Sequence, residues 1–192
     1  MMKRRNIQIT ALVAALMLTL LLSACGGSEV NSHAAAVIDA MCNAPNDDYY
    51  DPSAYTVLGG DTRTEEQKAE AEKAAERVSA NWEKLCEENF APSSQKTLLN
   101  SGTAMVFQAL TYPDPASVED ARLTSIEVKS VELKEEDKDL GYQTVTVTLT
   151  VNGESEYSFD VEFSIDKDGL IDKAPEIAPE VIDGLTALGK QK

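Results

Sequence analysis

The sequence predicts an α+β fold, in which N-terminal helices pack on a curved antiparallel β-meander. Two observations support this fold class. Apolar residues recur at steps of three and four between residues 64 and 89, which is typical of a helix with one buried face. After residue 121 the apolar period changes to two, which is typical of strands with one buried face. Helices followed by a run of strands indicate an α+β domain.

The helical half starts with a predicted short helix over residues 34–42. Three of its apolar residues share one face: Val37, Ile38 and Met41. Asn, Pro and Asp residues stop this helix and favour a loop over residues 43–63. The tyrosines of this loop lie either in a mobile surface loop or packed on the domain: Tyr49, Tyr50 and Tyr55.

The clearest predicted helix covers residues 64–89. Thr64 is a candidate N-cap, and Gln67, three residues later, completes a capping box. The apolar stripe of this helix consists of Ala71, Ala74, Ala75, Val78, Trp82, Leu85 and Cys86. We expect this stripe to cover the apolar face of the sheet. After this helix, Leu98 and Leu99 indicate a short helix, and residues 107–112 indicate a strand.

In the meander, residues 142–151 and 157–165 alternate between apolar and polar side chains and predict two strands. An earlier alternation falls out of step and predicts a β-bulge near residues 129–130. The rest of the chain is predicted as a turn over residues 166–169, a strand beginning within residues 170–177 and a closing helix over residues 179–188.

The hairpin loop near Gly153 is expected to have an odd number of residues. A two-residue loop would pair Val151 with Glu154 and would set each valine of the first strand opposite a polar side chain. An odd loop moves the register by one residue, so that Val147 meets the apolar side of the next strand. The sequence therefore predicts a three-residue loop with Gly153 in the left-handed conformation.

The order of a long helix, short middle segments and twisted hairpins resembles the cystatin-like cone fold of the nuclear-transport-factor-like superfamily. The resemblance covers residues 34–177 and implies a pocket between helix and sheet, where some members act as isomerases or dehydratases through an acid, a histidine or a tyrosine. In this sequence Asp160 interrupts the polar-facing register of its strand and is the candidate acid, with Tyr112, Tyr142 and Tyr157 as candidate neighbours, but these residues match no motif of the superfamily. The candidate lining residues are Trp82, Phe107, Tyr112, Tyr157 and Phe159. Inward aromatic residues of this kind more often fill a core.

The N-terminus has the features of an export signal. The basic residues 3–5 precede an uncharged apolar stretch over residues 9–22. The segment Leu22-Ser23-Ala24-Cys25 then resembles the lipobox of bacterial lipoproteins, whose cysteine is acylated and becomes the mature N-terminus. The chain is therefore expected to divide into a signal peptide (1–24), a flexible tether (25–33) and a single α+β domain (34–192).

Acylation of Cys25 would hold the protein on the extracytoplasmic face of the cell membrane, because two or more acyl chains such as palmitate give stable anchoring. In a Gram-negative cell, Gly26 after the cysteine is similar to a signal for outer-membrane sorting. The alternative is a signal anchor that stays in the membrane, since the uncharged stretch over residues 6–28 is just long enough to span a bilayer.

The chain is strongly acidic, with a formal charge of −16. Loss of residues 1–24 removes three of the 17 basic residues and none of the 33 acidic ones, which makes the charge of the mature chain −19. This charge disfavours nucleic acid as a partner, and it also disfavours electrostatic docking on anionic lipid. A solvated acidic surface is the simplest interpretation, and a cationic partner is the alternative.

Few residues of the mature chain suggest chemistry. Cys42 and Cys86 are either joined by a disulfide, as export allows, or buried as free thiols. His33 is expected to be solvated beside the tether, and a single histidine offers neither a Ser-His-acid triad nor a multi-histidine metal site. The acids of residues 166–172 partly resemble a calcium loop, but a hairpin turn explains them with less assumption. We therefore expect no metal, cofactor or catalytic residue.

The sequence thus predicts a membrane-tethered extracytoplasmic lipoprotein with a non-catalytic binding domain. Besides membrane lipid at Cys25, its expected partner is a protein, a peptide, a glycan or a small apolar molecule. Two alternatives stay open: a small-pocket enzyme of the cone fold, and a structural subunit of an envelope complex. A cavity with a buried acid or tyrosine would indicate the enzyme, and an exposed apolar patch would indicate the subunit.

Overall fold

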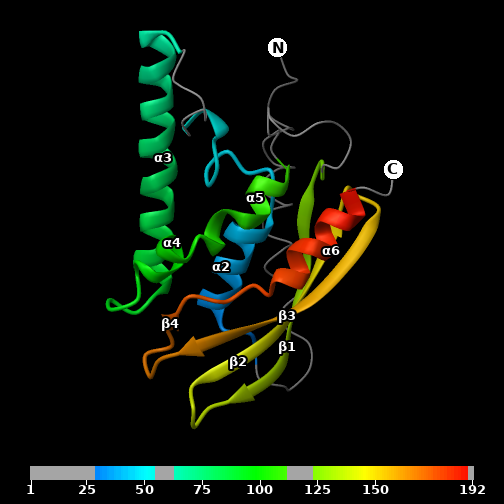
Figure 1. Ribbon diagram of the computed structural model, residues 1–192. Helices are drawn as coiled ribbons and strands as arrows, with labels where there is room; N and C mark the ends of the chain where they lie inside the picture. The colour runs from blue at the N-terminus through cyan, green and yellow to red at the C-terminus, as the bar shows by residue number, and fades with distance from the viewer. Residues whose placement is uncertain (1–28, 55–62, 112–122, 190–192) are drawn as a thin grey trace, which may run out of the picture.

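The structure, a computed structural model, describes residues 29–54, 63–111 and 123–189. In this part of the chain, helices and an antiparallel sheet of order β1-β2-β3-β4 form an α+β fold (Figure 1). The strands are β1 (Ile126–Asp137), β2 (Tyr142–Val151), β3 (Ser155–Ile165) and β4 (Ile171–Lys173). The helices are α2 (Ser32–Cys42), α3 (Glu65–Asn89), α4 (Thr97–Ser101), α5 (Val106–Thr111) and α6 (Pro179–Gly189), with 3-10 turns η1 (Pro52–Ala54) and η2 (Thr103–Met105).

The sheet confirms the predicted meander. Every second residue of β2 is buried, and the threonines between them lie on the uncovered face. The predicted bulge is present, because the pairing of β1 with β2 shifts between Val128 and Ser130. A second shift, between Leu133 and Glu135, has no counterpart in the sequence analysis. Two bulges and many charged side chains make β1 a poor template for pairing with another chain.

The β2–β3 hairpin has the odd register that the sequence predicts. Val147 pairs with Phe159, and three residues separate the two strands. Gly153 is left-handed, with φ of 70°, and Asn152 before it is also left-handed, with φ of 54°. The register therefore places all valines of β2 on the same face as the apolar residues of β3.

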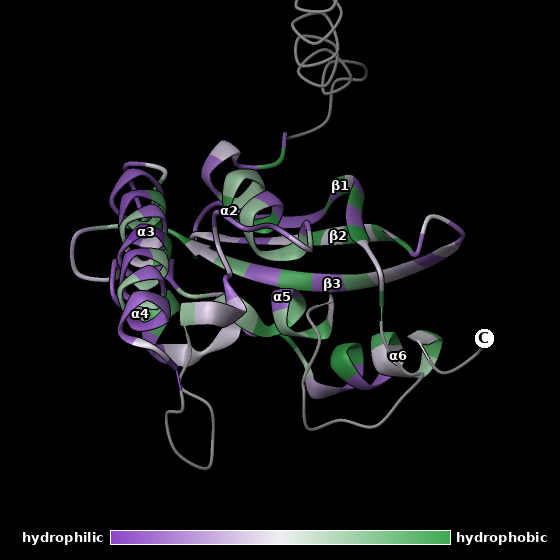
Figure 2. Ribbon diagram, turned by 90° about the horizontal axis from the view of Figure 1, so that it is seen from above, coloured by the Kyte–Doolittle hydropathy of each residue, from purple (hydrophilic) through white to green (hydrophobic). Residues whose placement is uncertain are grey.

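The helices cover one face of the sheet in an arrangement that differs from the expected one. The stripe of α3 was expected to cover the sheet, but α3 packs mainly on α2 and η1, and α2 is the helix that lies against β1. Helices α5 and α6 continue the cover towards β3. Figure 2 shows α3 at the side of the molecule farthest from α6. The expectation failed because α2 has the more apolar sequence and takes the inner position.

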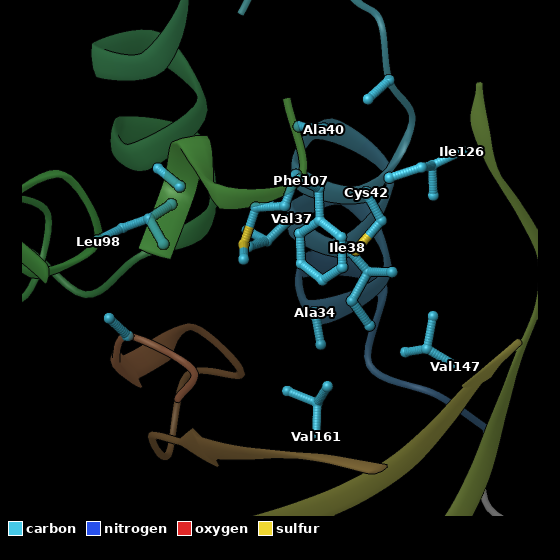
Figure 3. Packing of buried hydrophobic residues seen from close by; sticks show 14 of the residues in the cluster. Ala34, Val37, Ile38, Ala40, Cys42, Leu98, Phe107, Ile126, Val147 and Val161 are labelled. Carbon is cyan, nitrogen blue, oxygen red and sulfur yellow. The ribbon is translucent and has the colours of Figure 1, made fainter. Parts of the chain in front are cut away.

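The core lies between these helices and the sheet. Figure 3 shows Ala34 and Ile38 of α2 on the side that faces Val147 and Val161 of the sheet, with the ring of Phe107 beside them. All five residues are buried. An apolar face on α2 and an apolar face on the meander thus meet directly, as two-layer domains require.

Side-chain caps fix the starts of helices α2 and α3. The predicted capping box of α3 is confirmed: Thr64 Oγ1 accepts from the N–H of Gln67, and the Gln67 side chain accepts from the N–H of Thr64. Helix α2 starts at Ser32, inside the predicted tether, because Asn31 Oδ1 accepts from the N–H groups of His33 and Ala34 at 2.9 and 3.1 Å. The folded part therefore begins earlier than expected.

His33 was expected to be a solvated residue beside the tether, and this expectation is wrong. It lies in α2, half-buried, and its Nδ1 donates to the side-chain oxygen of Asn89 at 3.0 Å. Asn89 is buried at the end of α3 and donates in turn to Leu85 O at 2.8 Å. The histidine thus joins α2 to α3.

Residues 106–111 form helix α5, so the strand predicted over residues 107–112 is wrong. Six residues are too few for a hydrophobic period to separate helix from strand. The helix buries Gln108, whose side chain accepts from Asn46 N–H at 2.9 Å and donates to Asn43 O at 2.7 Å. These bonds hold the loop that follows α2. Tyr112 lies outside the described residues.

Candidate functional site

Three segments lie together at one end of the sheet, which we call the tether end: residues 29–31, the β1–β2 turn (138–141) and the β3–β4 turn (166–170). The two turns are linked because Ile165 N–H donates to Gly141 O at 2.7 Å. Gly141 is left-handed, with φ of 72°, and a Cβ there would lie 2.5 Å from Ile165 O. Only glycine therefore allows this approach.

Asn31 fixes the entering chain to the tether end. Its N–H donates to Gln143 Oε1 at 2.9 Å, and its side-chain Nδ2 donates to Gly169 O at 2.8 Å. The side-chain Nε2 of Gln143 donates to Glu29 O at 3.2 Å and to Glu136 Oε1 at 3.0 Å. The first described residues are thus bonded to β2 and to the β3–β4 turn.

An aspartate holds each turn of the tether end. Asp137 Oδ1 accepts from the N–H groups two and three residues later, at 3.1 and 3.0 Å. Asp166 Oδ1 accepts from the N–H groups two and four residues later, both at 2.9 Å. These bonds are typical of aspartates that stabilise turns. The segment that partly resembles a calcium loop is therefore the predicted turn, and the described residues contain no group of three His, Cys, Asp or Glu able to hold a metal.

An open hollow of about 490 Å³ lies at the tether end. Asn31, residues 136–143 and residues 165–167 line it. Leu140 and Tyr142, which are 70% and 41% exposed, are the large apolar residues that the described chain exposes most. The charged lining residues are Glu136, Asp137, Lys138, Asp139, Asp166 and Lys167. The lining has no serine, cysteine or histidine, so it lacks the residue types of a Ser-His or Cys-His nucleophile pair.

The aromatic candidates for a pocket do not share one site. Phe107 and Phe159 stack in the core, with ring centroids 5.9 Å apart, and Tyr157 lies beside Phe159 at 6.4 Å. Trp82 lies on α3, and Tyr112 is outside the described residues. Trp82 and Phe107 have no exposed surface, so their places agree with a filled core, the alternative that the sequence analysis favoured.

The loop after α2 packs on the domain around Trp82. Trp82 Nε1 donates to Tyr49 O at 2.8 Å, and the two rings lie 4.6 Å apart. Arg77 donates to Asp51 at 2.8 Å, and hydrogen bonds from Ser53 and Arg77 lower the pKa of Asp51. Burial and nearby carboxylates raise the pKa of Tyr49. Tyr49 therefore stays protonated and acts as a packing residue.

A mainly apolar groove of about 290 Å³ lies beside this loop. Its lining consists of Ala54, Ala75, Val78, Ser79, Trp82, Leu99 and Met105. Ala54 is followed by residues 55–62, which lie outside the described residues. The groove has one hydroxyl and no charged side chain with which to orient a ligand.

Cys42 and Cys86 are buried free thiols, so the bridge left open by the sequence is not formed in this structure. Burial, and secondarily Glu83, raises the pKa of Cys86 to about 11. Burial and then Asp39 also raise the pKa of Cys42. Because the thiolate is the reactive form, neither cysteine suits the role of a nucleophile at neutral pH.

The residues that organise the tether end were missed among the predicted site residues. Gln143 occupies a position of β2 in the same alternation as Val145 and Val147, and it is 6% exposed. A polar residue in an apolar register needs a hydrogen-bond partner, so this signal was available in the sequence. Asp160, the acid named for a cone-type pocket, faces outward and accepts from Lys134 Nζ at 2.6 Å.

Comparisons of the chain with models of known protein families, with curated proteins and with solved structures find no match. No helix among residues 29–54, 63–111 and 123–189 is long and apolar enough to cross a membrane. The predicted signal peptide (1–24) and Cys25 lie outside the described residues.

Proposed function

We propose that the protein is an extracytoplasmic lipoprotein, anchored to the cell membrane by acyl chains on Cys25, whose domain binds a partner without catalysing a reaction. The observation that carries the proposal is the fixed entry of the chain at Asn31, a few residues after the lipobox. In a Gram-negative cell this membrane is the outer membrane. The partner is a protein, a peptide, a glycan or a small apolar molecule, and nucleic acid is disfavoured by the acidic charge.

The position of this entry supports an anchored role. Asn31 and Gln143 bond the chain to the sheet, so the free tether ends before residue 30 and is shorter than the predicted 25–33. Three residues lie between Cys25 and Glu29, and the four steps from one to the other reach at most about 14 Å. A domain held this closely works at the membrane surface.

The chemistry of the described residues supports binding in preference to catalysis. The hollow at the tether end is polar and open, and two of its aspartates are occupied by turn amides. The thiols of Cys42 and Cys86 are buried and protonated at neutral pH. No buried acid faces either the hollow or the apolar groove beside Trp82.

The anchor is tested by Cys25→Ala, with Cys42→Ala as the matched control. We expect wild type and Cys42→Ala to enter the detergent phase and the membrane fraction, and Cys25→Ala to remain an uncleaved precursor or to appear in the soluble fraction. The N-terminal peptide of the wild type should carry the mass of a diacylglyceryl cysteine. An unmodified mature N-terminus at another residue contradicts the proposal.

The cystatin-like cone, with its small-pocket enzymes, is the second proposal. An antiparallel meander covered by helices supports this family, and the place of α3 on α2 departs from it. The discriminating variant is Phe107→Ala. If Phe107 fills the core, this substitution lowers the unfolding free energy by about 3–5 kcal/mol. If Phe107 lines a substrate pocket, the substitution lowers the unfolding free energy only slightly. A small decrease in unfolding free energy, measured by urea denaturation, would favour the enzyme.

A further inference from the structure

We propose that the β1–β2 turn, residues 138–141, touches the lipid surface and forms a second membrane contact beside the acyl anchor. The inference rests on the proposed acylation of Cys25. The structure brings together the point where the chain leaves towards Cys25 and the most exposed large apolar side chain of the described residues, Leu140. Figure 1 shows the β1–β2 and β3–β4 turns together at the lower end of the sheet.

Chain length places the tether end next to the membrane. The link from Cys25 to Glu29 reaches at most about 14 Å. Glu29 O is bonded to Gln143, and Leu140 lies three residues away along the same chain, which is about 10 Å. The opposite end of β2, at Val151, lies about 30 Å from Tyr142. The short link therefore reaches a bilayer only from the tether end.

The side chains of the turn suit a lipid interface. Leu140 is 70% exposed and Tyr142 is 41% exposed, although both are large and carry apolar surface. Tyrosine is enriched where membranes meet water. The ammonium groups of Lys138 and Lys167 pair with Glu136 and Asp168, so they partly neutralise the carboxylates beside the turn. Because the acyl anchor makes the contact intramolecular, a weak apolar contact is enough to orient the domain.

The charge of the tether end selects the kind of lipid. Its hollow carries four carboxylates and two ammonium groups, so an anionic surface would repel it. Asp137 and Asp166 are engaged by turn amides, and Glu136 accepts from Gln143. The contact is therefore apolar and suits a neutral headgroup such as phosphatidylcholine.

Brominated phosphatidylcholine vesicles test the contact, because bromine quenches a nearby tryptophan. The acylated full-length mature protein is prepared as Leu140→Trp and as the matched control Glu154→Trp. Both positions are exposed turn residues, at opposite ends of β2. The natural Trp82 is fully buried and contributes the same background to both variants. We expect brominated lipid to lower and blue-shift the emission of Leu140→Trp and to leave that of Glu154→Trp unchanged.

Sedimentation with the vesicles separates the two proposals. If the protein stays in the supernatant, or if its N-terminal peptide carries no lipid, the proposed anchor has failed. If the protein sediments with its lipid but Leu140→Trp is not quenched, or if both variants are quenched equally, the anchor stands and the turn contact is overturned. Free access of aqueous acrylamide to Leu140→Trp on vesicles also overturns it, because the side chain then stays in water.

Discussion

The hydroxyl oxygen of Tyr157 lies 2.4 Å from the place that a Cβ on Gly184 would take. Gly184 is in the middle of α6, and Tyr157 is on β3. Tyr157 Oη also donates to Glu180 O, one turn earlier in the helix, at 3.3 Å. The absence of a side chain at Gly184 therefore sets how closely α6 approaches the sheet.

We expect Gly184→Ala to destabilise the domain by about 1–3 kcal/mol, because the new methyl group pushes the ring of Tyr157 away. Without this contact the same substitution in a helix would stabilise by about 1 kcal/mol, so the sign of the change is diagnostic. Urea denaturation measures it. In a Tyr157→Ala background Gly184→Ala should no longer destabilise, and a stabilising effect in the wild-type background would contradict the contact.

Asn152 contributes to the hairpin through its backbone and its side chain. Its φ is 54°, and its Oδ1 accepts from Thr124 N–H and Oγ1 at 2.6 and 3.0 Å. Asn152→Gly keeps the left-handed backbone and loses the hydrogen bonds, at a cost of about 1 kcal/mol. Asn152→Ala loses both and should cost about 1–2 kcal/mol more. Equal unfolding free energies for the two variants would show that the left-handed conformation is not required.

Gln108→Met should destabilise strongly even though the two side chains have similar volumes. It leaves Asn46 N–H and Asn43 O, which are partly buried, without their partner on the buried Gln108, and each unsatisfied group costs about 1–3 kcal/mol. The matched control is Gln95→Met, at a half-buried turn position, which should stay within about 0.5 kcal/mol of wild type. Thermal and urea unfolding measure both variants. A loss no larger than that of the control would refute the bridging role.

Stability should fall in alkaline solution through Cys86. Burial raises the pKa of this thiol from its ordinary value near 9 to about 11 in the folded state. The contribution of the protonated Cys86 thiol to the unfolding free energy is complete below pH 9. It is lost as the pH rises towards 11, because in this range only the unfolded chain releases the thiol proton. Wild type should therefore lose stability relative to Cys86→Ala across this window, as urea midpoints would report. A constant difference between the two proteins would rule this linkage out.

Local signals in the sequence were sufficient to predict several structural features. The capping box at Thr64 and Gln67 needs only residues three positions apart, and it is present. The hairpin register followed from the requirement that Val147 face an apolar partner, because a shift of one residue reverses both faces of a strand. These features depend on neighbours in the chain or across one turn.

The predictions that were wrong or missing depend on contacts between segments that are distant in the sequence. Residues 107–112 were too few to show a period, and α5 is helical because Phe107 and Gln108 find partners on β3 and on the loop after α2. The stripe around Trp82 is apolar, but the sequence alone does not say whether it packs on a sheet or on another helix. The partners of Asn31 at the tether end are separated from it by more than a hundred residues. Such pairings become visible only once the chain is folded.

The bonds of Asn31 also decide where a mechanical pull on the N-terminus is borne. Force arriving through Glu29 meets hydrogen bonds to Gln143 on β2 and to Gly169 beyond β3 before it reaches the first turn of α2. An isolated helix pulled from its first residue would unwind turn by turn. Here the load passes into strands whose pairing spans the sheet. The domain would thus resist being drawn out by the proposed acyl anchor.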